Sequence, residues 1–139
     1  MNIKLVHENA VLPQKAGINE IGYDITCISL DKQIYENVYM FDTGIQIQPP
    51  KGYYTEIVPR SSIVKTGYSL ANNTGIIDPT YRGNVKVVLV KHAQDAQKIE
   101  LPFKKCQLIL RKIPPNVEVQ EVQELDQTER GDGGFGSTD

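Results

Sequence analysis

The lack of helical periodicity is the feature that most restricts how this chain can fold. No stretch of the 139 residues places apolar side chains at positions i, i+3, i+4 and i+7 for three helical turns. Apolar and polar residues instead alternate over short segments, and clusters of Gly, Pro, Asn and Asp separate these segments. About ten short strands with turn signals every 8–12 residues are typical of a β-sandwich or barrel. The sequence therefore predicts an all-β domain.

The expected strands are the segments that alternate most clearly or are richest in strand-forming residues: 3–6, 43–48, 53–58, 84–91, 106–113 and 117–122. Residues 61–66 are expected to form at most one short helix, capped by a hydroxyl side chain that follows Pro59 and Arg60. The composition changes near Thr128, after which glycine is abundant. We therefore expect one domain over residues 1–127 and a flexible Gly-rich C-terminal arm over residues 128–139.

The charge balance argues against a polymeric ligand, because the net charge is −2 and the isoelectric point is about 5.7. The longest apolar run, Val87 to Val90, is too short to cross a membrane, and no targeting or secretory signal is recognisable. We expect a cytoplasmic or nuclear protein without a nucleic-acid polymer or a membrane as partner. Cys27 and Cys106 fit no metal or redox spacing and are expected to be buried free thiols, with a disulfide as the alternative.

The C-terminal arm combines glycine with side chains suited to a nucleotide. Backbone N–H groups of a Gly-rich segment can turn toward a phosphate, and Arg130 offers a charged fork for phosphate oxygens. Ser137 and Thr138 add hydroxyl donors, and Phe135 offers a flat face on which a base can stack. These residue types favour a flap that closes over a nucleotide, and an inert solubilising tail is the alternative.

Two further segments contain residues suited to an anion and to catalysis. Arg60, Ser61 and Ser62 lie at the N-terminus of the expected short helix, where free N–H groups and the helix dipole favour a phosphate. Residues 72–83 are expected to form a hairpin in which Asp78 acts as a general base. The alternative for the first segment is ordinary helix capping with a surface Arg. The alternative for the second is a polar turn in which Asp and Pro serve only the turn conformation.

Two shorter segments carry weaker signals. Asp24 follows Gly22 and an aromatic residue, so its carboxylate could face a metal ion or its waters, or could be a solvated turn residue. Gln107 opens an apolar strand and could contact a ligand or lie at a sheet edge.

Together and in this order, these segments resemble the motifs of the trimeric dUTPase family (deoxyuridine 5′-triphosphate nucleotidohydrolases). The matching stretches are 22–25, 59–67, 75–83, 106–109 and 130–138, and the resemblance runs from about residue 3 to the C-terminus. It implies a distorted jelly-roll β-barrel, the β-clip of this family, and a homotrimer with active sites at subunit interfaces. The arm of one subunit would close over an active site of another.

The resemblance implies hydrolysis of dUTP to dUMP and pyrophosphate, which limits uracil incorporation into DNA and supplies dUMP for dTMP synthesis. Asp78 would activate the water that attacks the α-phosphorus. Mg²⁺ would be held mainly by the substrate phosphates and would contact Asp24 through water. A metal ion also suits the chain itself, since few cationic side chains could converge on a triphosphate.

The substrate-binding residues that the resemblance implies are Arg60, Ser61, Ser62, Asn72, Gly75, Ile77, Asp78, Tyr81, Gln107, Arg130, Phe135, Gly136, Ser137 and Thr138. The backbone of residues 72–78 would read the uracil edge, and Tyr81 would pack beneath the sugar and exclude a 2′-hydroxyl. Phe135 would stack on the base.

The match has departures, among them Ser62 in place of Gly, Lys104 in place of Arg and Cys106 in place of Ala. Two alternative functions stay open. A dCTP deaminase shares the fold, but it relies on a glutamate base and lacks the Gly-rich fifth motif. A catalytically idle homologue would bind a nucleotide or a regulatory partner without releasing pyrophosphate.

Overall fold

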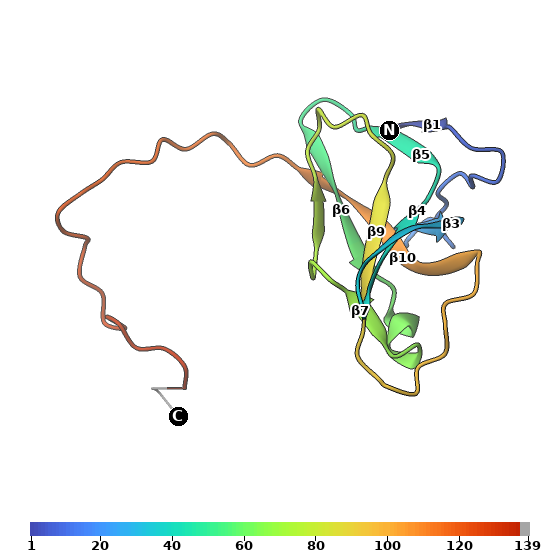
Figure 1. Ribbon diagram of the computed structural model, residues 1–139. Helices are drawn as coiled ribbons and strands as arrows, with labels where there is room; N and C mark the ends of the chain where they lie inside the picture. The colour runs from blue at the N-terminus through green and yellow to red at the C-terminus, as the bar shows by residue number, and fades with distance from the viewer. Residues whose placement is uncertain (137–139) are drawn as a thin grey trace.

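The computed structural model describes residues 1–136 and is built almost entirely of strands (Figure 1). The elements are β1 (Asn2–Leu5), β2 (Tyr23–Cys27), β3 (Ser29–Tyr35), β4 (Val38–Asp42), β5 (Ile45–Gln48), β6 (Tyr53–Pro59), the 3₁₀ helix η1 (Ser61–Lys65), β7 (Tyr68–Leu70), β8 (Gly75–Ile77), β9 (Lys86–Lys91) and β10 (Phe103–Lys112). The prediction of an all-β fold is confirmed. Among the described residues, no helix combines the length and apolar character needed to cross a membrane.

The strands form three antiparallel sheets. One four-stranded sheet has the order β2-β10-β6-β8, a second has the order β3-β4-β9-β7, and β1 pairs with β5. Together they form a distorted jelly roll whose sheets do not join into a closed barrel. Strand β10 pairs with β2 on one side and with β6 on the other, so it brings distant parts of the chain together.

The core lies between the sheets and follows from the alternation seen in the sequence. Val85, Val87 and Leu89 are at most 1% exposed, whereas the residues between them are only partly buried. Ile25 and Leu108 contribute the facing side chains from the other sheet. Full burial of one such side chain stabilises the fold by roughly 1.5–3 kcal/mol.

The two cysteines are buried and free, as predicted, on the adjacent strands β2 and β10. Burial raises the pKa of the Cys106 thiol to about 12 and raises the pKa of Cys27 still further above its usual range. Both thiols are therefore protonated at neutral pH, and they serve as small apolar residues of the core.

The predicted short helix exists, but its predicted cap is wrong. Arg60 is the N-cap residue of η1 and makes no side-chain capping hydrogen bond, while Ser61 is already inside the helix. The hydroxyl that stabilises this helix acts at its other end, where Thr66 Oγ1 donates to the Ile63 carbonyl over 2.6 Å.

The hairpin predicted for residues 72–83 is also more elaborate than expected. Strands β7 and β9 do pair, but the chain between them forms β8, which pairs with β6 in the other sheet. Asn73 turns the chain with a positive φ of 55°. This excursion from one sheet to the other is what opens a pocket beside β8.

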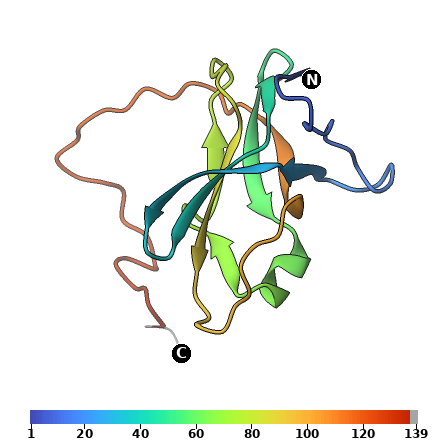
Figure 2. The ribbon, with the colours of Figure 1, turned by 45° about the vertical axis from the view of Figure 1, so that its right-hand side comes forward.

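The strand predicted for residues 117–122 does not form, and this segment pairs with no strand among residues 1–136. Strand β10 ends at Lys112, and the following residues run away from the sheets (Figures 1 and 2). Val117 is 74% and Val119 is 96% exposed. An alternating segment forms a strand only where a neighbouring strand accepts its hydrogen bonds, and this part of the chain meets none.

Candidate active site

A pocket of about 230 Å³ lies where β8 meets β6 and the start of β9. Its lining residues are Ile57, Asn72, Gly75, Ile76, Ile77, Asp78, Tyr81, Asn84, Val85 and Lys86. Five predicted site residues therefore meet at one place, namely Asn72, Gly75, Ile77, Asp78 and Tyr81. They come from a stretch of only ten residues, because β8 and the turn after it wrap around the pocket.

Gly75 allows β8 to pack closely against its neighbours at this pocket. A Cβ atom on Gly75 would lie 3.2 Å from the Cβ of Ile57 and 3.3 Å from Nδ2 of Asn72, both tighter than ordinary packing. Glycine therefore lets β8 approach β6 and the Asn72 amide closely. Residues 75–77 then border the pocket directly.

Tyr81 forms one wall of the pocket, and its ring lies against the backbone of Gly83. Its hydroxyl donates to the Asn84 carbonyl over 3.0 Å. A Cβ on Gly83 would overlap the Tyr81 ring, so only glycine allows this placement. The Tyr81 side chain stays 46% exposed and can pack against a ligand.

Asp78 follows β8 and carries an exposed carboxylate at the pocket. Its backbone carbonyl accepts a hydrogen bond from the Tyr81 N–H over 3.0 Å, which holds the two residues in one turn. Within residues 1–136 the carboxylate takes part in no ion pair. It is therefore available to a water molecule or a ligand hydroxyl.

A second group of predicted site residues lies at the far end of β6. Arg60 Nη1 lies 3.0 Å from Oδ2 of Asp24, and Lys104 Nζ lies 3.8 Å from the same oxygen. Arg60 also donates to the Lys104 carbonyl over 3.3 Å. The Asp24 side chain is 14% exposed and the Arg60 side chain 35%, so this charged group borders solvent.

Gln107 belongs to this second group and does not lie at a sheet edge, because β10 is flanked by β2 and β6. Its side-chain amide donates to the Pro59 carbonyl over 3.3 Å. A Cβ on Gly22 would collide with this amide, so the glycine of the first motif makes room for the glutamine of the fourth. Ser61 is exposed and Ser62 half-buried in the first turn of η1.

The two groups are far apart within one chain. Ile77 pairs with Thr55, so continuation of the register places Asp78 level with Tyr54. Arg60 lies six residues further along the chain, which corresponds to about 20 Å at about 3.3 Å per strand residue. One chain therefore does not bring Asp78 and Arg60 to the same phosphate group.

The described part of the arm contacts neither group. Arg130 Nε donates to the Gly133 carbonyl over 2.9 Å, and the Phe135 side chain is fully exposed. Gly136 has a positive φ of 80°. The predicted phosphate ligands Ser137 and Thr138 lie outside the described residues.

The residues near Asp24 suit a magnesium ion that is carried by phosphates. Within residues 1–136, no cluster of three or more His, Cys, Asp or Glu residues could hold a metal ion alone. Asp24 offers one carboxylate beside two cationic side chains. Mg²⁺ often takes one or two carboxylates and completes its shell with substrate phosphates and water, so this donor set fits.

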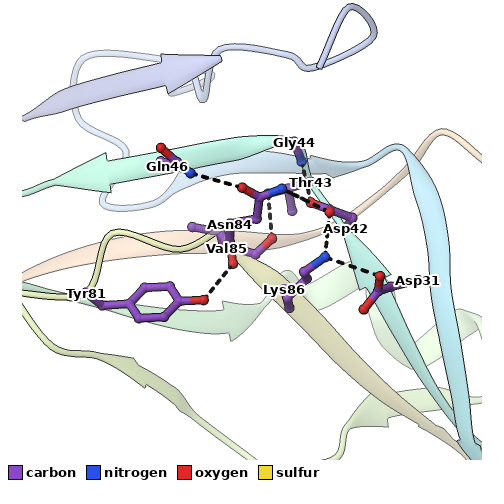
Figure 3. A network of polar contacts seen from close by, with 9 residues as sticks. All are labelled: Asp31, Asp42, Thr43, Gly44, Gln46, Tyr81, Asn84, Val85 and Lys86. Carbon is purple, nitrogen blue, oxygen red and sulfur yellow. Dashed lines mark hydrogen bonds and ion pairs between the residues drawn. The ribbon is translucent and has the colours of Figure 1, made fainter. Parts of the chain in front are cut away.

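Sequence reasoning missed a network of four polar residues at the pocket (Figure 3). Lys86 Nζ lies 2.5 Å from Oδ2 of Asp42 and 3.4 Å from Oδ1 of Asp31. Asn84 Nδ2 donates to the same Asp42 oxygen over 3.1 Å. Asn84 and Lys86 are polar residues two apart at the start of an apolar strand, a spacing that places them on one face.

The network shifts the pKa values of its ionisable members. Burial alone would raise the pKa of Asp42, but hydrogen bonds from Lys86, the Gly44 N–H and Asn84 outweigh burial and lower it. Burial alone would lower the pKa of Lys86, but Asp42 and Asp31 raise it. Asp42 and Lys86 are therefore both charged at neutral pH.

Comparison with known proteins connects this geometry to a family. The dUTPase family model matches residues 8–139. The deoxyuridine 5′-triphosphate nucleotidohydrolase of Solanum lycopersicum is 39% identical over 136 residues, which cover 98% of this chain and 79% of the relative. That of Clostridium tetani is 36% identical over 140 residues, which cover 99% of this chain and 95% of the relative.

Solved structures share the fold. A dUTPase variant of Staphylococcus bacteriophage 80alpha with dUpNHpp matches with a TM-score of 0.78 and 22% identity, covering 99% of this chain and 96% of that one. A dUTPase variant of phage phi11 of S. aureus, described with a structural Mg(II) ion, matches with a TM-score of 0.68 and 19% identity. The match covers 91% of this chain and 98% of that one. By the family model and the relatives that cover nearly its whole length, this chain belongs to the dUTPase family.

Proposed function

We propose that this protein hydrolyses dUTP to dUMP and pyrophosphate. The observation that carries the proposal is the pocket beside β8, which brings Asp78, Tyr81 and the Asn72 side chain around one nucleoside-sized space. The relatives named above act as deoxyuridine 5′-triphosphate nucleotidohydrolases, and the residues of this pocket suit that reaction.

In the proposed reaction, Asp78 holds a water molecule and accepts its proton as the water oxygen attacks the α-phosphorus. A bond from this oxygen to phosphorus forms, and the bond from phosphorus to the bridging oxygen of the β-phosphate breaks. The electron pair leaves with pyrophosphate, and dUMP stays in the pocket. The exposed carboxylate of Asp78, free of ion pairs within residues 1–136, supports this role.

The same pocket gives a physical basis for substrate choice. The backbone of residues 75–77 offers N–H and C=O groups to the uracil edge, with the Asn72 side chain beside it. The ring of Tyr81 packs beneath the sugar and leaves no space for a 2′-hydroxyl. Such steric selection requires that the Tyr81 ring stay in a fixed position.

The second group of residues binds the phosphates in this proposal. Arg60 gives a charged fork, the hydroxyls of Ser61 and Ser62 add donors, and the Gln107 amide lies beside them. Mg²⁺, when bound to the phosphates, neutralises their charge and fixes their orientation. Asp24 would contact this ion through water.

We infer a homotrimer with a composite active site, because Asp78 and Arg60 lie about 20 Å apart within one chain. The pocket of one chain would face the Arg60 group of a second chain. The unpaired segment 117–122 would find its strand partner on a neighbouring subunit.

The arm would complete the site. Residues 1–127 form the body in this proposal, and residues 128–139 close over an active site of another subunit. Phe135 stacks on the uracil, while Arg130, Gly136, Ser137 and Thr138 hold the distal phosphates. A Gly-rich arm loses conformational entropy on closing, so closure takes place only when substrate is bound.

The test is pyrophosphate release with Mg²⁺ from dUTP, dCTP, dTTP and UTP, measured beside an Asp78→Asn variant. Turnover of dUTP alone, lost in the variant, supports the proposed reaction and base. Deamination of dCTP would instead favour the deaminase alternative. Binding of dUTP without turnover would favour an idle homologue, and full activity of Asp78→Asn would exclude Asp78 as the base.

A further inference from the structure

The Asp42 carboxylate stands at the centre of the polar network beside the pocket (Figure 3). It accepts hydrogen bonds from the Gly44 N–H over 2.7 Å and from Asn84 Nδ2 over 3.1 Å, and it pairs with Lys86 Nζ. Its side chain is only 17% exposed. A carboxylate with three donors in a half-buried position has little freedom to move.

Asn84 connects Asp42 to the pocket. Its side chain is held at both ends, because its amide donates to Asp42 and its Oδ1 accepts from Gln46 Nε2 over 3.2 Å. The backbone carbonyl of the same residue accepts the hydrogen bond of the Tyr81 hydroxyl. The position of the Asn84 peptide therefore sets where the far end of the Tyr81 ring lies.

Val85 anchors the peptide that joins it to Asn84. The Val85 carbonyl accepts from Thr43 Oγ1 over 2.7 Å, and the Val85 N–H donates to the Ile45 carbonyl over 2.8 Å. Thr43 follows Asp42 directly, so the end of β4 holds both residues 84 and 85. Tyr81 itself is 46% exposed, so nearly half of its surface is free of packing within residues 1–136.

We propose that Asp42 is a positioning residue for the sugar side of the pocket: through Asn84 it fixes Tyr81, and so it sets the preference for deoxyribose over ribose. The inference rests on the proposed function. Asp42 does not line the pocket, but its partners Asn84 and Lys86 do, and its route to the sugar side runs through Asn84 and Tyr81. A Tyr81 ring that shifts away would admit a 2′-hydroxyl while Asp78 stays in place.

The test compares Asp42→Ala and the isosteric Asp42→Asn with the wild type, using kcat and KM for dUTP and UTP. We expect the ratio of kcat/KM for dUTP over UTP to fall about tenfold in Asp42→Ala, the low end of steric discrimination. The change should appear mainly as a lower KM for UTP, with kcat for dUTP nearly unchanged. Asp42→Asn keeps the shape of the side chain, so its ratio should lie between those of the wild type and Asp42→Ala.

A matched control removes another carboxylate that joins two strands. Glu56 pairs with Arg111 over 3.0 Å and lies outside the pocket lining, so Glu56→Ala should leave the ratio unchanged. Asn84→Ala serves as a second variant if Asp42→Ala does not fold, and it should lower the ratio too. An unchanged ratio in the folded variants, or an equal loss for both nucleotides, would overturn the proposal.

Titration calorimetry with dUMP and UMP separates this inference from the proposed reaction. The wild type should bind dUMP more tightly than UMP, and Asp42→Ala should reduce that difference by a similar factor. A smaller preference in Asp42→Ala than in the wild type, without pyrophosphate release from either, would contradict the reaction and still support the positioning role. Equal preference in wild type and Asp42→Ala would contradict the positioning role alone.

Discussion

Arg60 Nη1 lies 3.0 Å from Oδ2 of Asp24, so the cation expected to hold phosphates is already paired with the carboxylate expected to face the metal ion. In the proposed site, substrate would replace this pair: the phosphates would take Arg60, and the metal shell would take Asp24. We therefore expect metal and phosphate binding to be linked through this ion pair, which borders solvent.

This pair leads to a first prediction, for Asp24→Asn. The concentration of Mg²⁺ that gives half-maximal dUTP turnover should rise, because the amide is a weaker partner for metal-bound water. The free energy of unfolding should change by less than about 1 kcal/mol, since Arg60 is partly solvated. A magnesium titration checks this, with Glu56→Gln as control. An unchanged magnesium dependence would contradict it.

The distance between Asp78 and Arg60 predicts complementation between subunits. Asp78→Asn and Arg60→Ala should each be inactive alone. If each site takes Asp78 from one chain and Arg60 from the next, random 1:1 mixing in a three-fold ring restores about a quarter of the sites. The measurement is dUTP turnover after the two variants are unfolded and refolded together. A site built within one chain would give no recovery.

The unpaired segment 117–122 predicts an effect on assembly. Val119 is 96% exposed in the isolated chain, so Val119→Asp should leave the fold of the body intact. It should weaken the trimer, because each buried Val contributes roughly 1.5–3 kcal/mol. Light scattering during gel filtration measures the mass. Gln120→Asp adds the same charge at the neighbouring polar position, and an equal effect of both variants would argue against a buried Val119.

Gly75→Ala should destabilise the fold and the pocket together. Its Cβ would lie 3.2 Å from Ile57 Cβ, and such overpacking costs about 1–3 kcal/mol. We also expect weaker dUTP binding, since Asn72 must move. Gly17→Ala is the matched control, because its Cβ would meet only Glu20 Cγ at 3.9 Å. Chemical unfolding and KM measure both effects, and equal unfolding free energies of the two variants would refute the close approach.

The Asp42 network predicts a pH dependence of stability. The pKa of Asp42 is lowered in the folded state, so its contribution is present above the ordinary carboxyl range and is lost as the pH falls through the lowered value. The pKa of Lys86 is raised, so its contribution is lost only at strongly alkaline pH. In urea unfolding between pH 7 and pH 3, the free energy of unfolding should therefore fall more steeply for the wild type than for Asp42→Asn. Parallel curves would contradict this.

Local patterns in the sequence were sufficient for much of the fold. The alternation of residues 43–48 and 84–91 is a property of neighbouring residues, and most of each segment forms a strand, β5 and β9 respectively. The pocket residues Asn72 to Tyr81 could be predicted as a group because they lie close together in the chain. The short helix after Arg60 was predicted too, although the hydroxyl cap predicted for it was wrong.

The amino-acid sequence by itself determined the all-β class, the residue types of the site and the family, since each depends on local alternation or on short motifs. Only the tertiary structure decided that Asp78 and Arg60 lie at opposite ends of β6 and that residues 117–122 find no strand partner in the described part of their own chain. It also decided that Asp42 meets Asn84, 42 residues away. Such contacts depend on the register of strands far apart in the chain, and no local pattern encodes that register.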